Sequence, residues 1–230
     1  MADISQRILI VHQNFPGQFR RIGHVWAQQP GWEVIGMGRR TAPGMDTVRW
    51  IPYDTSRKPG KETHPYLRQM EDAVLHGQAT ARVMMKLKQQ GYRPDAILAH
   101  PGWGETLYVR DIFPDARLIH FCEWFYGTPN SDTGFDPEFP TSFDTLTKLR
   151  TWNALHTLNL GHCDVGVSPT QWQRSRHQRE IGQVLDGVVA AIGARFDPGN
   201  VLADGRHLPA GKSRRRDQHR EVGLAAGAGE

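Results

Sequence analysis

The sequence lacks any apolar run approaching the roughly 18 residues that a membrane-spanning helix needs, although 38% of its 230 residues are hydrophobic. Its N-terminus also lacks the hydrophobic region of a secretory signal, because "ILIV" provides only enough apolar residues for a strand. These absences predict a cytoplasmic protein with at most peripheral contact with a membrane.

Cysteine is scarce, since Cys122 and Cys163 are the only two in the chain. This number fits a reducing compartment, so we expect both thiols to be free. His120 and Cys122 alternate onto one face of a predicted strand, which makes a metal site conceivable. No complete second pair of ligands stands at zinc spacing, however, and we favour buried neutral side chains at both positions.

Several motifs of cofactor binding and catalysis are incomplete or absent. "GMGRRT" and "GWGETL" begin the G-x-G-x-x-G pattern of dinucleotide binding but lack its third glycine. "GRHLPAGKS" has five residues before Gly211 and Lys212 where a phosphate-binding P-loop has four, and no strand precedes it. Neither G-x-S-x-G nor H-E-x-x-H occurs. We therefore expect no nicotinamide, metal or other cofactor.

Most of the chain also lacks an excess of charge of one sign, because its positive and negative residues nearly balance. The formal net charge is +4, and residues 203–230 hold about half of it, with six Lys/Arg against four Asp/Glu. No basic helix or base-stacking module stands out, so nucleic acid is not an expected partner. Residues 203–230 contain no aromatic side chain, and we expect residues 188–230 to form a divergent, disordered tail.

What the sequence does contain is a regular alternation of apolar runs and helical patterns. This alternation predicts one α/β domain over residues 4–187, with a Rossmann-like parallel sheet and helices on both faces. The predicted strands are residues 7–12, 32–37, 47–53, 95–100, 116–122 and 164–168. The predicted helices begin near Phe19 and cover residues 63–90, 105–112, 141–160 and 170–178.

Unusual polar and aromatic loops follow four of the predicted strands. They read "HQNFPGQF", "HPGWGE", "CEWFYG" and "SPTQW". Ligands bind outside the carboxyl ends of the strands in open parallel sheets, so the four loops together predict one site. Glu123 is its candidate catalytic residue. The candidate substrate-binding residues are Gly17, Gln18, His100, Trp103, Gly104, Glu105, Tyr126, Ser168 and Thr170.

Some of these residues also have ordinary structural explanations. Gly17 lets a ligand approach the backbone beside a helix N-terminus, but it also suits a simple turn between a strand and a helix. Trp103 stands between two glycines beside His100, an arrangement suited to packing on the apolar face of a sugar. Glu105 is either part of the site or a carboxylate that complements a helix dipole.

Glu123 stands at a strand end and is followed by three aromatic residues. Burial among them would raise its pKa and suit it to accept a proton or to bind a hydroxyl group. We expect its carboxylate to lie beside Trp103 and Tyr126. The alternative is a capping or ion-paired carboxylate.

The longest motifs resemble the N-terminal domain of a bacterial subgroup of glycosyltransferase family 4. The resemblance covers residues 8–187 and includes "ILIVHQNFPGQFR", "HPYLRQMEDAVLHGQATAR", "PDAILAHPGWGETLYVRDIFPDARLIHFCEWFY", "GFDPEFP", "LRTWNALHTLNL" and "CDVGVSPTQWQRS". It implies one half of a GT-B fold, in which two Rossmann-like domains face each other across a cleft. It also implies transfer of a sugar from a nucleotide-sugar to a glycan or lipid-linked acceptor, with retention of the anomeric configuration and no bound metal. By resemblance, Gly17 lies near the donor phosphates, while His100 and Glu123 line the acceptor side.

The sequence departs from the family pattern after residue 187. The Glu-x₇-Glu motif that commonly holds the nucleotide-sugar in the second domain occurs nowhere. We expect a truncated form without the donor domain. The Ala, Gly and Arg bias of the tail suggests reading out of frame, which sequencing the gene with its downstream DNA would test.

Two classes of function therefore remain open. One is a glycosyltransferase. The other is a non-catalytic sugar- or partner-binding domain, or the acceptor half of a split enzyme whose second chain carries the donor domain.

Overall fold

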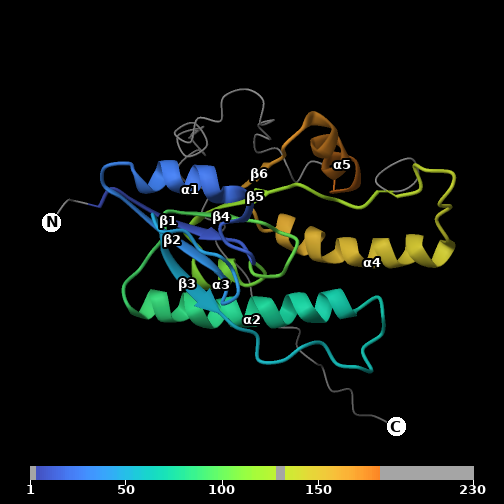
Figure 1. Cartoon of the computed structure of the whole chain (residues 1–230), viewed down its shortest axis with the longest axis horizontal. Coiled ribbons are helices and arrows are strands. Elements are labelled where there is room, and N and C mark those ends of the chain that lie inside the picture. Colours follow the sequence, from blue (N-terminus) through green and yellow to red (C-terminus); the bar gives the residue numbers. More distant parts are fainter. Residues whose placement is uncertain (1–3, 128–132, 182–230) are drawn as a thin grey trace, which may run out of the picture.

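A computed structural model describes residues 4–127 and 133–181. In this part of the chain, six parallel strands form one sheet in the order β3-β2-β1-β4-β5-β6 (Figure 1). The strands are β1 (Gln6–Val11), β2 (Trp32–Arg39), β3 (Arg49–Tyr53), β4 (Ala96–Ala99), β5 (Arg117–Phe121) and β6 (Val165–Val167). The predicted tail and the last residues of the predicted domain lie outside the described residues.

Helices lie on both faces of the sheet, with α1 on one side and α2 on the other (Figure 1). The helical segments are η1 (Gly17–Phe19), α1 (Arg20–Ala27), α2 (Arg68–Gln89), α3 (Val109–Ile112), α4 (Phe143–Leu160) and α5 (Gln171–Ile181). The predicted Rossmann-like α/β fold is confirmed. None of the helices described is both long enough and apolar enough to cross a membrane.

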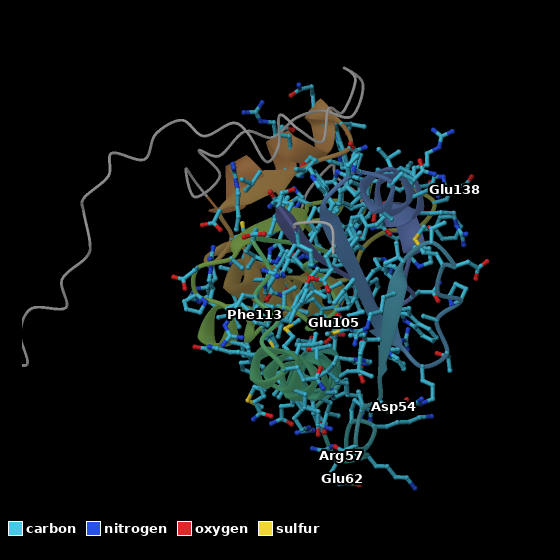
Figure 2. All side chains as sticks on the ribbon, turned by 90° about the vertical axis from the view of Figure 1, so that its left-hand side faces the viewer. Asp54, Arg57, Glu62, Glu105, Phe113 and Glu138 are labelled. Carbon is cyan, nitrogen blue, oxygen red and sulfur yellow. The ribbon has the colours of Figure 1, made fainter. Side chains whose placement is uncertain are left out.

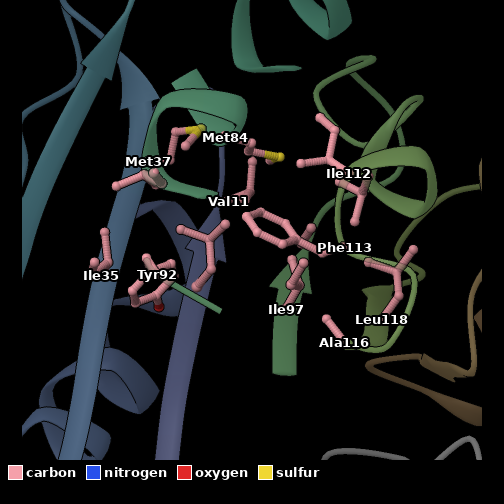
Figure 3. Packing of buried hydrophobic residues seen from close by; sticks show 14 of the residues in the cluster. Val11, Ile35, Met37, Met84, Tyr92, Ile97, Ile112, Phe113, Ala116 and Leu118 are labelled. Carbon is pink, nitrogen blue, oxygen red and sulfur yellow. The ribbon is translucent and has the colours of Figure 1, made fainter. Parts of the chain in front are cut away.

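Two hydrophobic clusters hold the helices against the sheet. Successive side chains of a strand point to opposite faces, so Ile8 and Ile10 pack on the side of Trp26 in α1, while Leu9 and Val11 pack on the side of α2. Strands buried on both faces appear in a sequence as continuous apolar runs, which explains why the strands could be predicted well. Figure 3 shows part of the second cluster, including Val11, Met84, Ile97, Phe113 and Leu118.

The strand order reverses between β1 and β4, which are neighbours in the sheet. Val11 pairs with Ala99 at the last position of the register, so the residues that follow, His12 and His100, leave the sheet side by side. This reversal is the switch point at which open parallel sheets bind ligands. The fold therefore brings the two histidine-containing loops to one edge.

Two predicted helices are shorter in the structure. α2 begins at Arg68 rather than at residue 63, and Pro65 precedes it in a turn whose Thr63 donates to Glu71. α3 begins at Val109 rather than at residue 105, and the residues before it form turns, in which the Leu107 N–H donates to the Gly104 oxygen and the Val109 N–H to the Thr106 oxygen. By contrast, the predicted cap of α4 is present, since the Ser142 side chain accepts from the backbone N–H of Thr145.

Candidate functional site

Two histidine rings meet at the switch point between β1 and β4. The centroids of His12 and His100 are 6.0 Å apart, with the rings almost perpendicular. The Nδ1 atom of His12 accepts from the Asn14 backbone N–H at 3.1 Å, and that of His100 accepts from Gly102 at 3.0 Å. In each neutral ring the proton therefore lies on Nε2. The loop backbones thus fix the tautomer of both histidines.

Glu123, which follows β5, joins these histidines. Its Oε2 atom lies 3.6 Å from Nε2 of His100 and 3.5 Å from Nε2 of Gln18, which donates to it. Residues from the loops after β1, β4 and β5 therefore converge on one carboxylate oxygen, and three of the predicted site residues lie together.

The environment of Glu123 differs from the sequence-based expectation. Its side chain is 48% exposed, and hydrogen bonding to His100 lowers its pKa instead of raising it. The prediction of a raised pKa was wrong because the neighbouring Phe125 turns into the core while Glu123 turns outward. Glu123 is consequently ionised at neutral pH.

His12 remains uncharged at neutral pH. Its burial, together with the nearby His100, lowers its pKa to about 4. Gly17 has φ +50°, and a Cβ atom there would lie 2.5 Å from Cε1 of His12. Glycine at position 17 is therefore needed both for its backbone conformation and for its approach to the His12 ring.

Trp103 covers the outer side of His100. The two rings are stacked with centroids 5.7 Å apart, and 43% of Trp103 is exposed. An exposed indole beside a polar cluster offers an apolar face at the edge of the site. The role of Trp103 as a sugar platform stays a prediction.

Gly104 and Glu105 do not face the cluster formed by His12, His100 and Glu123. A Cβ atom on Gly104 would lie 2.1 Å from the Ala73 carbonyl oxygen of α2. Glu105 is 2% exposed and accepts from the Tyr53 hydroxyl at 2.6 Å (Figure 2). Burial raises the pKa of Glu105 to about 7. α3 begins four residues after Glu105, so Glu105 does not complement a helix dipole. The helix-dipole explanation of this residue was therefore wrong.

Tyr126 packs within an aromatic group beside α4. Its ring lies 6.2 Å from that of Trp124 and 5.9 Å from that of Trp152. The structure therefore gives Tyr126 aromatic neighbours other than Trp103.

Ser168 and Thr170 both follow β6. Ser168 is fully buried, and its hydroxyl has no hydrogen-bond partner among the described residues. The Thr170 hydroxyl accepts from the Gln173 backbone N–H at 3.2 Å, which caps the first turn of α5. The structure thus places Ser168 below the surface and Thr170 in a helix cap.

A hollow of about 170 Å³, a volume that includes space open to solvent, lies beside Glu123. The amide Nε2 of Gln173 donates to the Glu123 backbone oxygen at 3.0 Å, which ties the start of α5 to the loop after β5. The hollow is lined by Glu123, Trp124, Phe125, Trp172, Gln173 and Arg176. It extends the candidate site from the histidines towards α5.

The sequence profile of the glycosyl transferase family 4 group matches residues 30–191. The chain belongs to this family. No curated protein sequence matches it.

Solved structures similar to this family 4 chain include known sugar-transferring proteins. A sucrose-phosphate synthase from Thermosynechococcus elongatus is 15% identical over 86% of this chain and 94% of that chain, with a TM-score of 0.48. A UDP-glucosyltransferase from Polygonum tinctorium is 8% identical over 82% and 51%, with a TM-score of 0.49. Os79 from O. sativa, in complex with UDP, is 11% identical over 75% and 49%, with a TM-score of 0.47. This chain thus spans about half the length of the latter two, and likeness at this level identifies no substrate.

Sequence reasoning missed two residues of this family 4 domain. His12 follows β1 just as His100 follows β4, and this repetition was the available signal. Arg176 lies four positions after Trp172 on α5, a spacing that places both on one helix face.

The buried residues after and within β5 agree with the sequence analysis. His120 is fully buried, and burial lowers its pKa to about 3. Cys122 and Cys163 are free thiols. Within the described ranges, no group of three or more His, Cys, Asp or Glu residues is arranged to hold a metal ion.

Replacing His100 by phenylalanine is expected to raise the pKa of Glu123 towards its ordinary value. The change removes the N–H group that is the main cause of the lowered pKa while keeping a flat ring of similar size. The ¹³C chemical shift of the Glu123 carboxyl group, followed against pH, measures this directly. Gln18→Ala is the matched control and should move the titration less, since the first-listed cause lies with His100. An unchanged titration in His100→Phe would contradict this assignment.

Proposed function

We propose that this chain is the acceptor-side half of a GT-B glycosyltransferase. It acts with a donor domain to transfer a sugar from a nucleotide-sugar to a glycan or lipid-linked acceptor, with retention of the anomeric configuration. Membership of the glycosyl transferase family 4 group supports sugar transfer in general. The observation that carries the proposal is the convergence of Gln18 and His100 on the Glu123 carboxylate at the switch point of the sheet.

In this proposal Glu123 binds an acceptor hydroxyl. A carboxylate has about four lone-pair directions, so the hydrogen bond from Gln18 and the contact with His100, both at Oε2, leave Oε1 able to accept another hydrogen bond. An ionised carboxylate at neutral pH can orient the hydroxyl and accept its proton as the new bond forms. Trp103 supplies an apolar surface beside it for a sugar ring.

The second half of the proposed cleft would hold the nucleotide-sugar, either in another chain or in another domain. Closing two halves around a donor supplies both orientation of the reactants and exclusion of water. We therefore expect little or no transfer by the described domain without a donor domain. The test is to assay the purified chain with a panel of nucleotide-sugars, alone and with the donor domain of a close family 4 relative. Robust turnover without any added domain would overturn the need for the second half.

In such a reconstituted pair, Glu123→Gln is expected to lower the rate by roughly 10²-fold or more. Glutamine keeps the shape of the side chain but cannot accept a proton. The thermal midpoint should change little, because the Glu123 side chain is half exposed and glutamine can still contact His100. Rate and thermal midpoint are measured on the same protein, and the product is examined by NMR for its anomeric configuration. A normal rate in Glu123→Gln would remove Glu123 from catalysis.

The second candidate function is sugar binding without transfer. The exposed indoles of Trp103 and Trp172 favour it, because ring faces bind sugars without any need for catalysis. Binding of a sugar combined with failure of every donor-domain reconstitution would support this alternative.

A further inference from the structure

The buried side chain of Glu105 belongs to a row of polar groups that leads out to the surface of α2. The Tyr53 hydroxyl lies 2.6 Å from Oε1 of Glu105 and 2.8 Å from Nδ1 of His76. On the other side of the ring, Nε2 of His76 lies 3.7 Å from Oδ2 of Asp72, whose side chain is 51% exposed. Tyr53 and His76 are themselves buried. The row therefore connects a carboxyl group in the core with solvent through two buried side chains.

The Tyr53 hydroxyl gives this row two possible hydrogen-bonding arrangements. A hydroxyl has one hydrogen to donate, so it donates either to Glu105 or to His76. When Glu105 is ionised it accepts from Tyr53, and the Tyr53 oxygen accepts from the Nδ1–H group of His76. When Glu105 is protonated it donates to the Tyr53 oxygen, and Tyr53 donates to a bare Nδ1 of His76. In that second arrangement the proton of the neutral imidazole lies on Nε2, next to Asp72.

The two arrangements differ by one proton, and the row can carry it without opening the core. A proton from solvent binds Nε2 of His76, the proton on Nδ1 passes to the Tyr53 oxygen, and the Tyr53 hydrogen passes to Oε1 of Glu105. Both distances at the Tyr53 oxygen are short enough for such transfers. His76 and Tyr53 finish with as many protons as they had, so only Glu105 gains a proton and loses its charge. His76 finishes as its other tautomer.

The surroundings of the row favour this exchange near neutral pH. Burial raises the pKa of Glu105 to about 7, against the Tyr53 hydrogen bond and the positive charge of Arg39 on β2, while Asp72 on α2 favours the neutral acid. Burial lowers the pKa of His76, so its ring is neutral and changes its tautomer rather than its charge. Burial raises the pKa of Tyr53, which therefore keeps its hydrogen.

Glu105 also anchors the segment that carries His100 and Trp103 of the candidate site. Its side chain bonds to Tyr53 of β3, and its backbone oxygen accepts from the Thr80 hydroxyl of α2 at 2.9 Å. Because burial favours the neutral form of Glu105, protonation in turn stabilises its buried position. The charge of Glu105 thus governs how firmly this segment is held against α2 and β3.

We propose that Asp72, His76 and Tyr53 form a proton relay to Glu105, which makes the placement of the segment carrying His100 and Trp103 dependent on pH. Glu105 is then a positioning residue, which acts on the candidate site through that segment. The inference goes beyond the proposed function and does not rest on it, because the relay needs neither a donor nor an acceptor.

Nitrogen-15 NMR of the His76 ring in the full chain tests the relay, since the chemical shifts distinguish a protonated from a bare ring nitrogen. Between about pH 5.5 and about pH 8.5 we expect the proton to move from Nε2 to Nδ1 as the pH rises. The ¹³C shift of the Glu105 carboxyl group and the indole N–H resonance of Trp103 should change with the same midpoint. A constant His76 tautomer while Glu105 titrates would overturn the relay, and a Trp103 resonance that does not follow this midpoint would overturn its effect on the site.

Variants then assign the exchange to these residues. Glu105→Gln removes the titrating group, and its amide N–H can donate to Tyr53 as the protonated acid does. His76 should therefore keep its proton on Nε2 over this pH range. In Tyr53→Phe, which keeps the ring but lacks the hydroxyl, the His76 tautomer should no longer follow the titration of Glu105.

Glu123→Gln is the matched control, because it changes the exposed carboxylate of the candidate site and should leave the tautomer change of His76 intact. Thermal midpoints confirm that each variant is folded, and Glu105→Gln serves if Tyr53→Phe is not. A proton that still moves from Nε2 to Nδ1 in Glu105→Gln would refute the relay. Sugar transfer is not part of these measurements, so a failed transfer assay would remove the proposed function and leave the relay standing.

Discussion

Replacing Gly104 by alanine is expected to lower the free energy of unfolding by about 3–5 kcal/mol, or to prevent folding. Gly104 has φ +95°, and an added Cβ atom would lie 2.1 Å from the Ala73 oxygen and 2.5 Å from its carbonyl carbon. Both are backbone atoms of α2, so they cannot rotate away as a flexible side chain could. Gly77 on α2 meets the same loop, because its own Cβ atom would lie 2.7 Å from the Gly104 oxygen.

Gly91 is the matched control for this experiment. Its φ of +86° is similar, but no atom lies within 4 Å of the position of an added Cβ. Gly91→Ala therefore carries the backbone strain alone, about 1–2 kcal/mol. Denaturant unfolding of the two variants measures the difference, which isolates the steric contact between the loop and α2. An equal loss in both would contradict this contact. Normal stability in Gly104→Ala combined with lost sugar binding would return Gly104 to the binding site.

Acidification from pH 7.5 to pH 4 is expected to remove about 6–7 kcal/mol of folding free energy. The reason lies in His120 and His156, which are 0% and 4% exposed and whose pKa values burial lowers to about 3. In the unfolded chain a histidine has a pKa of about 6.5, so the unfolded state binds more protons between these values. The two histidines therefore cost no stability above pH 6.5, and they destabilise the folded state increasingly as the pH falls from 6.5 towards 3.

The size of the effect follows from two opposing contributions. Each of these histidines destabilises the fold by about 3 kcal/mol at pH 4. Glu105 acts in the other direction, because its pKa is raised to about 7 by burial and the folded state then binds the extra proton. It contributes about 3 kcal/mol of stability as the pH falls to 4. The lowered pKa of His12, about 4, adds about 3 kcal/mol to the loss.

Denaturant unfolding at a series of pH values measures this profile. His120→Leu removes one titrating group, so the fall in stability between pH 6.5 and pH 4 should become smaller by about one histidine's share. Ile119→Val is the control, since it changes the neighbouring buried residue and should lower stability by about 0.5–1.5 kcal/mol equally at every pH. A profile for His120→Leu parallel to that of the unchanged protein would show that His120 does not titrate on unfolding.

The strands were predicted from the sequence within one or two residues, most clearly the central ones, which are buried on both faces. Helix starts were predicted less well. Pro65 suggested the first turn of a helix, yet Glu71 bonds instead to Thr63 and to the backbone of Gly60, which holds that segment in turns. Such local competition between side chain and backbone is not visible in a hydrophobic pattern.

The candidate site was predicted only in part, for a similar reason. Its position at the carboxyl ends of the strands follows from topology, and His100 and Glu123 do meet there. The burial of Glu105 depends on Tyr53, which is 52 positions away in the chain, so no local sequence pattern predicts it.

The central position of β1 in the sheet also has a consequence during translation of the chain. β1 is synthesised before both of its neighbours, and one of them, β4, is reached 88 positions later, as the hydrogen bond between Arg7 and Asp95 shows. At roughly 5–20 residues per second, that edge of β1 stays open for about 4–18 s during translation. An unpaired apolar strand is a template for pairing with other chains. Nascent molecules of this protein therefore depend on shielding by chaperones for longer than a chain whose neighbouring strands follow one another.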